Sequence, residues 1–133
     1  MIELRPEPWT PELMAEVAEA FEGHAKSDTS GGLVGAVEGI ERGAFCRVLA
    51  DGEPVAFYVL FVRQHSGGLE VEISHAWGRA GFDITQQVLP LIERQCSQAA
   101  AVTIKTRRAG LIQKLKRQGY AVESVTLRKR SHA

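Results

Sequence analysis

The sequence feature that most constrains the fold is a set of three apolar segments joined by two short turns in the middle of the chain. Residues 45–50 and 55–63 flank the turn Asp51-Gly52-Glu53-Pro54, and Asp-Gly between two apolar runs is a strong hairpin signal. The turn at residues 65–68 then leads into residues 69–74, where apolar and polar residues alternate strictly. The three segments predict an antiparallel meander.

A helix is predicted on the N-terminal side of this meander, after a short first strand at residues 1–5. Thr10 and Pro11 form a good helix start, because threonine caps the free N–H groups and proline suits the first helical position. Apolar residues then recur at helical spacing over residues 13–21, opposite a row of glutamates. We expect this helix to end at Gly23.

Two further helices are predicted, one before and one after the meander. Residues 33–40 have weaker helical spacing, interrupted by two glycines. After the meander, a glycine-containing loop at residues 76–82 leads into a helix that opens at Asp83, whose spacing to Gln86 is typical of a capping box. Pro90 lies inside that helix, so either the helix kinks or its first turn is irregular.

The remaining residues predict a strand, a helix and a last strand. Residues 101–105 are apolar enough for a short strand, and Thr106 could cap the helix that follows. Gly119 is a typical C-terminal stop, and residues 120–129 then predict the last strand. No internal repeat is present.

The composition is that of one globular domain. The chain has 133 residues, of which 44% are hydrophobic and 24% charged, which is enough for a single core and close to ordinary usage. We therefore expect one domain over residues 1–133. The longest apolar run, residues 55–62, is far shorter than the roughly 20 residues that cross a bilayer, and the first residues lack a signal-peptide pattern. We expect a cytoplasmic protein without a membrane partner.

Cysteine and histidine bind metals most often in proteins, and in this sequence they do not have the spacing of a metal site. Cys46 and Cys96 lie far apart, with no Cys-x-x-Cys pair. The four histidines do not stand at ligand spacing with an acidic or thiol neighbour. The sequence therefore predicts no metal site.

The charged residues are divided unevenly along the chain, although the formal net charge is zero. Residues 1–72 hold five Lys or Arg and thirteen Asp or Glu, whereas residues 73–133 hold eleven and three. The C-terminal half would therefore hold an anion. Alternatively, the two halves attract each other within the domain or across a homodimer. Nucleic acid is a further candidate for this basic half, although aromatic residues for base stacking are nearly absent there.

The order of the predicted elements resembles that of the GNAT N-acetyltransferase family over essentially the whole chain. Two segments carry the resemblance. His75-Ala76-Trp77-Gly78-Arg79-Ala80 matches the family's Q/R-x-x-G-x-G/A loop, with histidine at its first position, and residues 108–120 match a helix that ends in glycine and an aromatic residue. The resemblance implies a single α+β domain whose mixed, mostly antiparallel sheet is flanked by about four helices.

The resemblance also implies that acetyl-CoA, or another acyl-CoA, is the cofactor. In the family, backbone N–H groups of the loop hold the pyrophosphate. A helix start offers free N–H donors and partial positive charge, and small residues allow a diphosphate to approach. The alternatives are a loop without a ligand and, for the tryptophan, a place in the core beneath the helix. The residues expected to bind the cofactor are Trp77, Gly78, Arg79, Ala80 and Gly81.

Acyl transfer to an amine requires a base, because the attacking amine must lose a proton. Glu70 and Glu72 share the face of the strand that borders the acceptor site in the resembled fold, and either could take the proton through water. His75 is the alternative base, because histidine titrates near neutrality. The candidate catalytic residues are Glu72 and His75, although solvated carboxylates and a structural histidine would give the same pattern. Leu115 stands where many family members carry the tyrosine that protonates the leaving thiolate.

These observations predict an enzyme that transfers an acetyl or short acyl group from CoA to an amine of a small molecule or a protein. An enzyme that mainly positions its substrates tolerates the missing tyrosine, because thiolates are good leaving groups. The alternative is a catalytically degenerate domain of the same fold that binds a protein or a nucleic acid.

Overall fold

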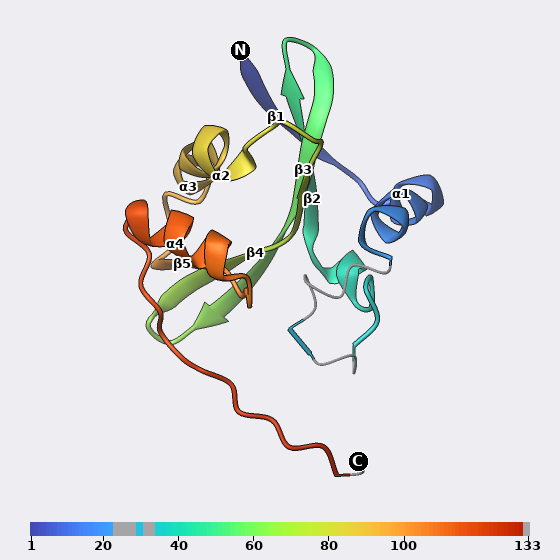
Figure 1. Ribbon diagram of the computed structural model, residues 1–133. Coiled ribbons are helices and arrows are strands. Elements are labelled where there is room, and N and C mark those ends of the chain that lie inside the picture. The colour runs from blue at the N-terminus through green and yellow to red at the C-terminus, as the bar shows by residue number, and fades with distance from the viewer. Residues whose placement is uncertain (23–28, 31–33, 132–133) are drawn as a thin grey trace.

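The computed structural model describes residues 1–22, 29–30 and 34–131. Its centre is a five-stranded sheet in the order β1-β2-β3-β4-β5 (Figure 1). The strands are β1 (Ile2–Glu7), β2 (Ala44–Ala50), β3 (Glu53–His65), β4 (Gly68–Gly78) and β5 (Ala101–Thr103). The first four pair antiparallel, whereas β5 runs parallel to β4. The predicted meander and the mixed, mostly antiparallel sheet are confirmed.

The helices lie on both sides of this sheet, with one side covered by α1 and the other by α2, α3 and α4 (Figure 1). Their bounds are α1 (Pro11–Phe21), the 3-10 helix η2 (Ile40–Arg42), α2 (Ile84–Gln87), α3 (Leu89–Gln95) and α4 (Ala109–Arg117). No helix in the described part of the chain is long and apolar enough to span a bilayer. The mixed sheet with helices on both faces confirms the α+β class predicted from the sequence.

Helix α1 begins as the sequence predicts. The Thr10 Oγ1 accepts a hydrogen bond from the Leu13 backbone N–H over 3.0 Å, and Pro11 occupies the first turn. Leu13 and Val17 are buried against Phe45 and other apolar residues of β2 and β3. This apolar cluster forms the core on the α1 side of the sheet.

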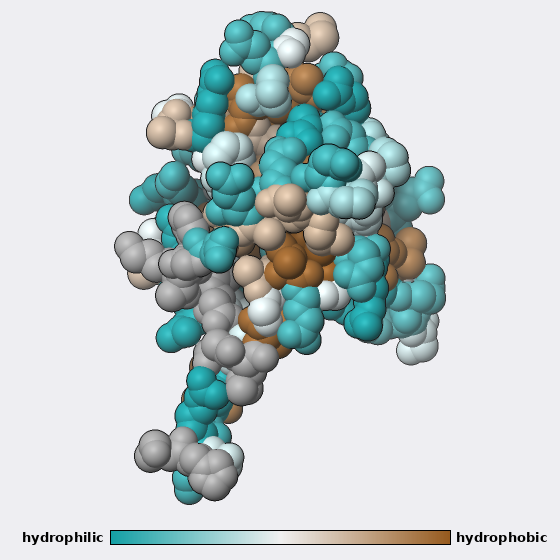
Figure 2. Space-filling view, turned by 90° about the vertical axis from the view of Figure 1, so that its right-hand side faces the viewer, coloured by the Kyte–Doolittle hydropathy of each residue, from teal (hydrophilic) through white to brown (hydrophobic). Residues whose placement is uncertain are grey.

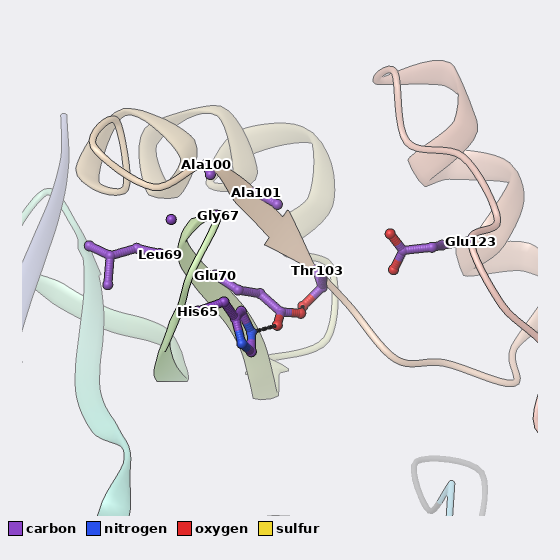
Figure 3. A pocket seen from close by; sticks show the side chains of 9 residues that line it. His65, Gly67, Leu69, Glu70, Ala100, Ala101, Thr103 and Glu123 are labelled. Carbon is purple, nitrogen blue, oxygen red and sulfur yellow. Dashed lines mark hydrogen bonds and ion pairs between the residues drawn. The ribbon is translucent and has the colours of Figure 1, made fainter.

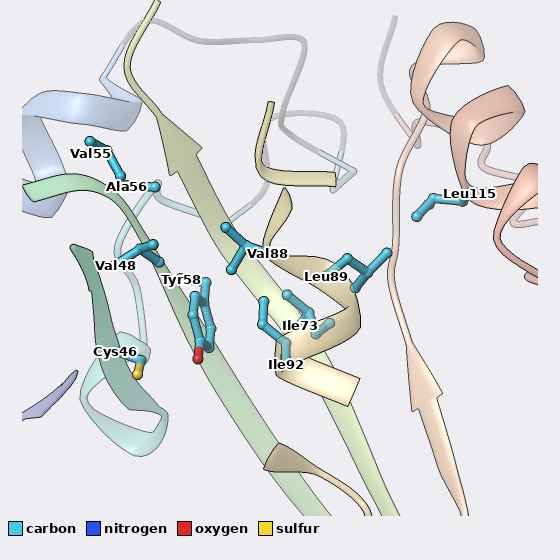
Figure 4. Close-up of a cluster of buried hydrophobic side chains, with 10 residues drawn as sticks. All are labelled: Cys46, Val48, Val55, Ala56, Tyr58, Ile73, Val88, Leu89, Ile92 and Leu115. Carbon is cyan, nitrogen blue, oxygen red and sulfur yellow. The ribbon is translucent and has the colours of Figure 1, made fainter. Parts of the chain in front are cut away.

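A second core lies on the opposite face, between the sheet and helices α3 and α4 (Figure 4). Tyr58 of β3 and Ile73 of β4 pack there with Val88 and Ile92. Leu115 of α4 is also buried in this cluster, with 6% of its surface exposed. Because α4 contributes this side chain to the core, its basic residues remain on the outside.

Two predicted elements are wrong. Residues 36–39 form a turn and η2 follows, so the described part of the second predicted helix is not α-helical, and Leu33 lies outside the described residues. Gly39 has φ +74°, a left-handed conformation that ends regular helix. Residues 120–129 form no strand, because a strand requires a partner edge and this segment does not reach one.

Two other expectations are refined. Pro90 falls in the first turn of α3, where its missing N–H costs no hydrogen bond, and the predicted single helix is divided at Val88 into α2 and α3. Helix α4 begins at Ala109 without a side-chain cap, and Thr106 accepts instead from the Arg108 N–H over 3.0 Å. Gly119, at φ +94°, ends α4 as predicted.

Candidate functional site

The candidate site lies where β4 and β5 separate. The last parallel pair joins Glu72 to Thr103. Beyond this pair β4 continues to Gly78, whereas β5 ends and the chain turns toward α4. Past Glu72, the side of β4 that faced β5 has no strand partner among the described residues, and we call this unpaired stretch the opening.

A β-bulge interrupts β4 directly after this point. Val59 pairs with Ser74 and Phe57 pairs with Trp77, so two residues of β4 lie opposite Tyr58 alone. One of them, His75, has φ +46°, a left-handed conformation that is uncommon for residues other than glycine. Bulges are enriched beside active sites because they redirect side chains and free backbone groups from the ladder. The strand therefore bends at the position where the sequence analysis placed a candidate catalytic residue.

Both ring nitrogens of His75 are engaged in hydrogen bonds. Its Nε2 lies 2.7 Å from the carbonyl oxygen of Ala36, and its Nδ1 lies 2.7 Å from the hydroxyl of Ser74. Because a carbonyl oxygen only accepts, Nε2 donates to it, and Nδ1 of the neutral ring then accepts from Ser74. The ring also contacts Phe21 edge to face, with centroids 5.3 Å apart. These contacts hold the imidazole in place and leave neither nitrogen free to take a proton from a substrate.

Glu72 is the most buried carboxylate among the described residues, with 8% of its surface exposed. Its Oε1 accepts a hydrogen bond from Arg63 over 2.8 Å and lies 3.9 Å from the Lys105 ammonium. No described residue donates a hydrogen bond to its other oxygen, so Oε2 has the capacity to accept one from water or an amine. The sequence analysis did not single out Arg63 as a partner, because that pairing depends on the register of β3 and β4.

Glu70 belongs to a separate hydrogen-bond group at the other end of the strand face. It accepts from His65 over 2.8 Å and from Thr103 over 3.0 Å. These two hydrogen bonds, His65 first, lower the pKa of the Glu70 carboxyl. With both oxygens already bonded, Glu70 is less suited than Glu72 to accept a proton.

A hollow of about 290 Å³ lies beside Glu70, between β5 and the segment after α4 (Figure 3). Ala101 and Thr103 form its β5 side and Glu123 its opposite side. It adjoins the start of β5, away from the loop that follows β4. The hollow is therefore distinct from the opening at the bulge.

The loop predicted to bind the cofactor is a tight turn at the end of β4. The Phe82 N–H donates to the Arg79 carbonyl over 3.0 Å, and Gly81, at φ +83°, occupies the left-handed position of this turn. The N–H groups of Ala80 and Gly81 have no hydrogen-bond acceptor within the described ranges. The Arg79 side chain is half exposed and lies 3.6 Å from Glu53. Arg79, Ala80 and Gly81 thus form one group of donors.

Trp77 and Gly78 lie in β4 itself, not in the loop as the sequence analysis expected. The Trp77 ring stacks on Phe57, with centroids 5.5 Å apart and planes inclined by 22°. Phe57 belongs to the core on the α1 side of the sheet, so Trp77 does not lie beneath α2 or α3. The alternative that Trp77 fills the core beneath the helix after the loop is therefore wrong. Gly78 faces the other way, and a Cβ there would lie 3.3 Å from the Phe82 carbonyl oxygen.

The start of α2 is occupied by its own cap. The Asp83 carboxylate accepts from the Gln86 N–H over 3.2 Å and lies 3.3 Å from the Lys114 ammonium. The Gln86 hydrogen bond, followed by that of Lys114, lowers the pKa of Asp83. Lys114 partly neutralises the Asp83 carboxylate, which reduces the repulsion between that carboxylate and an anion bound beside Arg79.

Neither tyrosine of the chain is placed to protonate a leaving group. The Tyr58 hydroxyl donates to Gln95 and that of Tyr120 donates to Glu93, each over 2.7 Å. Burial raises the pKa of both phenols well above the ordinary tyrosine value. Leu115 fills the second core instead. Among the described residues, the opening therefore lacks a phenolic acid.

The space-filling view of the α1 side shows a largely hydrophilic surface on which apolar side chains emerge near the middle (Figure 2). Trp77 contributes to the exposed apolar surface of the molecule, with 38% of its area accessible. A half-exposed aromatic ring beside a bulge can contact a ligand, although stacking on Phe57 already accounts for its position.

Comparison with known proteins gives one result for the sequence and another for the fold. No family model matches the sequence, and no curated protein matches it. Solved structures do match the fold. A GCN5-related N-acetyltransferase from Ralstonia eutropha JMP134 is 13% identical, with a TM-score of 0.68, and the match covers 98% of this chain and 99% of that chain.

Two other similar structures carry more specific names. Glucosamine-6-phosphate N-acetyltransferase from Arabidopsis thaliana is 14% identical, with a TM-score of 0.60 over 98% of this chain and 99% of its own. Ribosomal-protein-alanine N-acetyltransferase from Brucella melitensis biovar Abortus 2308 is 12% identical, with a TM-score of 0.62 over 97% of both chains. Together with the separation of β4 and β5 and the bulge in β4, these matches show that the chain has the fold of the GNAT N-acetyltransferases.

Proposed function

We propose that this protein transfers an acetyl or short acyl group from CoA to an amine. The observation that carries the proposal is the opening between β4 and β5, with the bulge at His75 on one side and the donor group of the loop at its end. The likeness to structures named as N-acetyltransferases supports the reaction class. The proposed acceptor is a small molecule or a protein.

The residues of the loop fit the phosphates of acetyl-CoA or another acyl-CoA. Two free N–H groups, of Ala80 and Gly81, and the Arg79 guanidinium can all donate to a phosphate oxygen. A Cβ at Gly81 would meet no atom within 4 Å, so the space beside this backbone is open. When bound, the acyl-CoA supplies the thioester whose carbonyl carbon is attacked by the amine.

Glu72 is the base that we propose for the amine. Its Oε2 accepts no hydrogen bond from a described residue, Glu72 lies at the last pair of β4 with β5, and its side chain is largely buried. Arg63 holds the carboxylate in position through Oε1. His75 then has a positioning role, because its hydrogen bonds to Ser74 and Ala36 hold the bulge in place. The reaction would proceed without a tyrosine acid, because the enzyme positions its substrates and the thiolate is a stable leaving group.

The surroundings of Glu72 bear on the acceptor. Glu70 and Glu72 place two carboxylates on one face of β4, and Arg63 and Lys105 lie beside Glu72 while His65 lies beside Glu70. These basic partners offset the negative charge, so charge alone does not select the acceptor. A protonated amine would have to lose its proton before attack.

Thermal unfolding with and without acetyl-CoA tests the binding part of this proposal. A ligand at about 100 times its dissociation constant stabilises a protein by about 2.7 kcal/mol, which raises the midpoint by several degrees. The variant Arg79→Ala should lose most of this rise. Arg5→Ala is the matched control, since Arg5 is also half exposed and also lies in a weak ion pair, 3.4 Å from Glu7 at the far edge of the sheet.

An equal rise in the parent and both variants would remove Arg79 from the cofactor site. No rise in the parent at a saturating concentration would contradict the proposed use of acetyl-CoA, and the same scan with other acyl-CoA thioesters would extend that result to the class. Loss of the rise in Arg79→Ala alone would support the placement of the phosphates at the loop.

A further inference from the structure

Two cations flank the proposed base on the sheet face that carries it. The Arg63 guanidinium donates from Nη1 to the Glu72 Oε1 over 2.8 Å, and the Lys105 ammonium lies 3.9 Å from the same oxygen. Arg63 belongs to β3 and Lys105 follows β5, so the two side chains approach Glu72 from the two sides of β4. One positive charge is enough to pair a buried carboxylate. The burial of Glu72 therefore does not account for the second cation.

Both cations keep most of their hydrogen-bonding capacity. A guanidinium has five N–H donors, and within the described part of the chain Arg63 uses only those of Nη1. The Lys105 ammonium is too far from Glu72 for a hydrogen bond and has no other acceptor among the described residues. The two side chains are 46% and 68% accessible. The free donors beside Glu72 can therefore be reached by a ligand.

The other carboxylate of this face does not occupy these donors. Glu70 lies 2.8 Å from His65 through Oε1 and accepts from Thr103 over 3.0 Å through Oε2 (Figure 3). Glu70 therefore offsets the charge of the two cations without filling their donors. The face is close to balanced in charge, so the free N–H groups, and not the net charge, indicate which ligand fits it. They require a group with several acceptor oxygens.

We propose that Arg63 and Lys105 bind an oxyanion, a carboxylate or a phosphate, that the acceptor carries beside its amine. The inference rests on the proposed function, in which Glu72 takes the proton of that amine. Both cations lie at Oε1 of Glu72, and the amine would donate to Oε2, so the acceptor has its two charged groups within a few bonds of each other. The guanidinium, already held at one nitrogen, presents its remaining N–H groups as a fixed fork. The substrate class is a small zwitterionic amine.

Matched pairs of amines test this inference. Free L-amino acids are compared with their α-amides, and O-phosphoethanolamine is compared with ethanolamine, so the two sets distinguish a carboxylate from a phosphate. Thiol release from acetyl-CoA gives kcat/KM, and calorimetric titration of the CoA-loaded protein gives Kd without turnover. At least one zwitterion should exceed its partner by about 10–100-fold in both, the range expected for hydrogen bonds to a charged group.

Two variants locate the site. Arg63→Met and Lys105→Met should each reduce this preference by about 10-fold or more, with the change in KM and not in kcat. Any disturbance of Glu72 acts on both members of a pair, so the ratio between them isolates the contact with the oxyanion. Lys116→Met is the matched control, since Lys116 is an exposed lysine of α4 on the opposite face of the sheet, and it should keep the preference of the parent.

The outcomes distinguish this inference from the proposed function. Transfer without a preference for zwitterions, or a preference that both variants keep, would overturn the inference and leave acyl transfer standing. Preferential binding of a zwitterion that the variants lose, without any thiol release, would support the oxyanion site and contradict acyl transfer. The absence of both binding and thiol release would overturn both.

Discussion

The His75 imidazole donates a hydrogen bond from Nε2 to the carbonyl oxygen of Ala36, 2.7 Å away, and this contact joins the bulge of β4 to the turn before η2. The two residues lie 39 positions apart in the sequence. The ring therefore connects two segments at the point where β4 bends. The bend, at φ +46°, sets the direction of the part of β4 that follows the last pair with β5.

The first prediction concerns the backbone at this bend. His75→Val should destabilise the protein by roughly 1–2 kcal/mol more than His75→Asn, because a β-branched residue tolerates a left-handed φ poorly and asparagine tolerates it well. Both variants remove the imidazole and its contact with Phe21, so the difference between them reports mainly the backbone. Urea denaturation measures it, and equal midpoints would show that the bend is not retained in solution.

The second prediction separates the two glutamates of β4. Glu72→Gln should lower kcat for acyl transfer by about 10²–10⁴-fold while leaving acetyl-CoA binding unchanged, because an amide cannot take the proton of the amine. Glu70→Gln is the matched control, two residues away on the same strand face, and should change kcat only a few-fold. Steady-state kinetics with an amine that the parent acetylates measures kcat, and titration with acetyl-CoA measures cofactor binding. A larger loss of kcat in Glu70→Gln than in Glu72→Gln would assign the base to Glu70.

The elements that the sequence predicts correctly are those with local signals. Thr10 caps α1 through a hydrogen bond to a residue three positions on, and Asp51-Gly52 forms the hairpin turn with both residues at positive φ. Such signals are complete within a few residues. The α1 start and the meander follow from them directly.

The features that the sequence did not reveal depend on pairing between distant segments. Alternation alone does not show that β4 continues past Ser74, because the bulge at His75 shifts the alternation and so hides Trp77 and Gly78 as strand residues. The Arg63–Glu72 ion pair requires the register of β3 and β4. The strand predicted at residues 120–129 fails for the same reason, since an edge partner cannot be read from local sequence.

The third prediction compares two glycines that differ in the space around them. Gly43→Ala should destabilise the protein by about 1–3 kcal/mol, because its Cβ would lie 2.5 Å from the Val59 side chain and 3.1 Å from the Leu60 carbonyl oxygen. Gly110→Ala, in the first turn of α4 with no atom within 4 Å of the new Cβ, should stabilise by up to about 1 kcal/mol. Thermal unfolding of both variants would show midpoints on opposite sides of the parent, and a shift of the same sign in both would contradict the packing described here.

The fourth prediction concerns the acid stability of the N-terminal half. Arg47 donates to Glu7 over 2.7 Å and 3.2 Å and also to Glu16. The Arg47 hydrogen bond lowers the pKa of the Glu7 carboxyl, and burial opposes the effect only in part. A carboxyl whose pKa is lower in the folded state stabilises the fold above its unfolded pKa, about 4.3 for glutamate, and this contribution disappears as the pH falls through the folded pKa.

Glu7→Gln should therefore reduce the free energy of unfolding near pH 7 by an amount on the order of 1 kcal/mol. The deficit relative to the parent should shrink as the pH falls below about 4.3, because the parent then loses the same contribution. In an Arg47→Met background most of the pH-dependent part of this deficit should be lost, since the main donor that lowers the Glu7 pKa is gone and only the weaker contribution of Arg5 remains. Urea denaturation of the four proteins across this range measures it, and a deficit that is constant with pH would mean that Glu7 acts through packing and not through its charge.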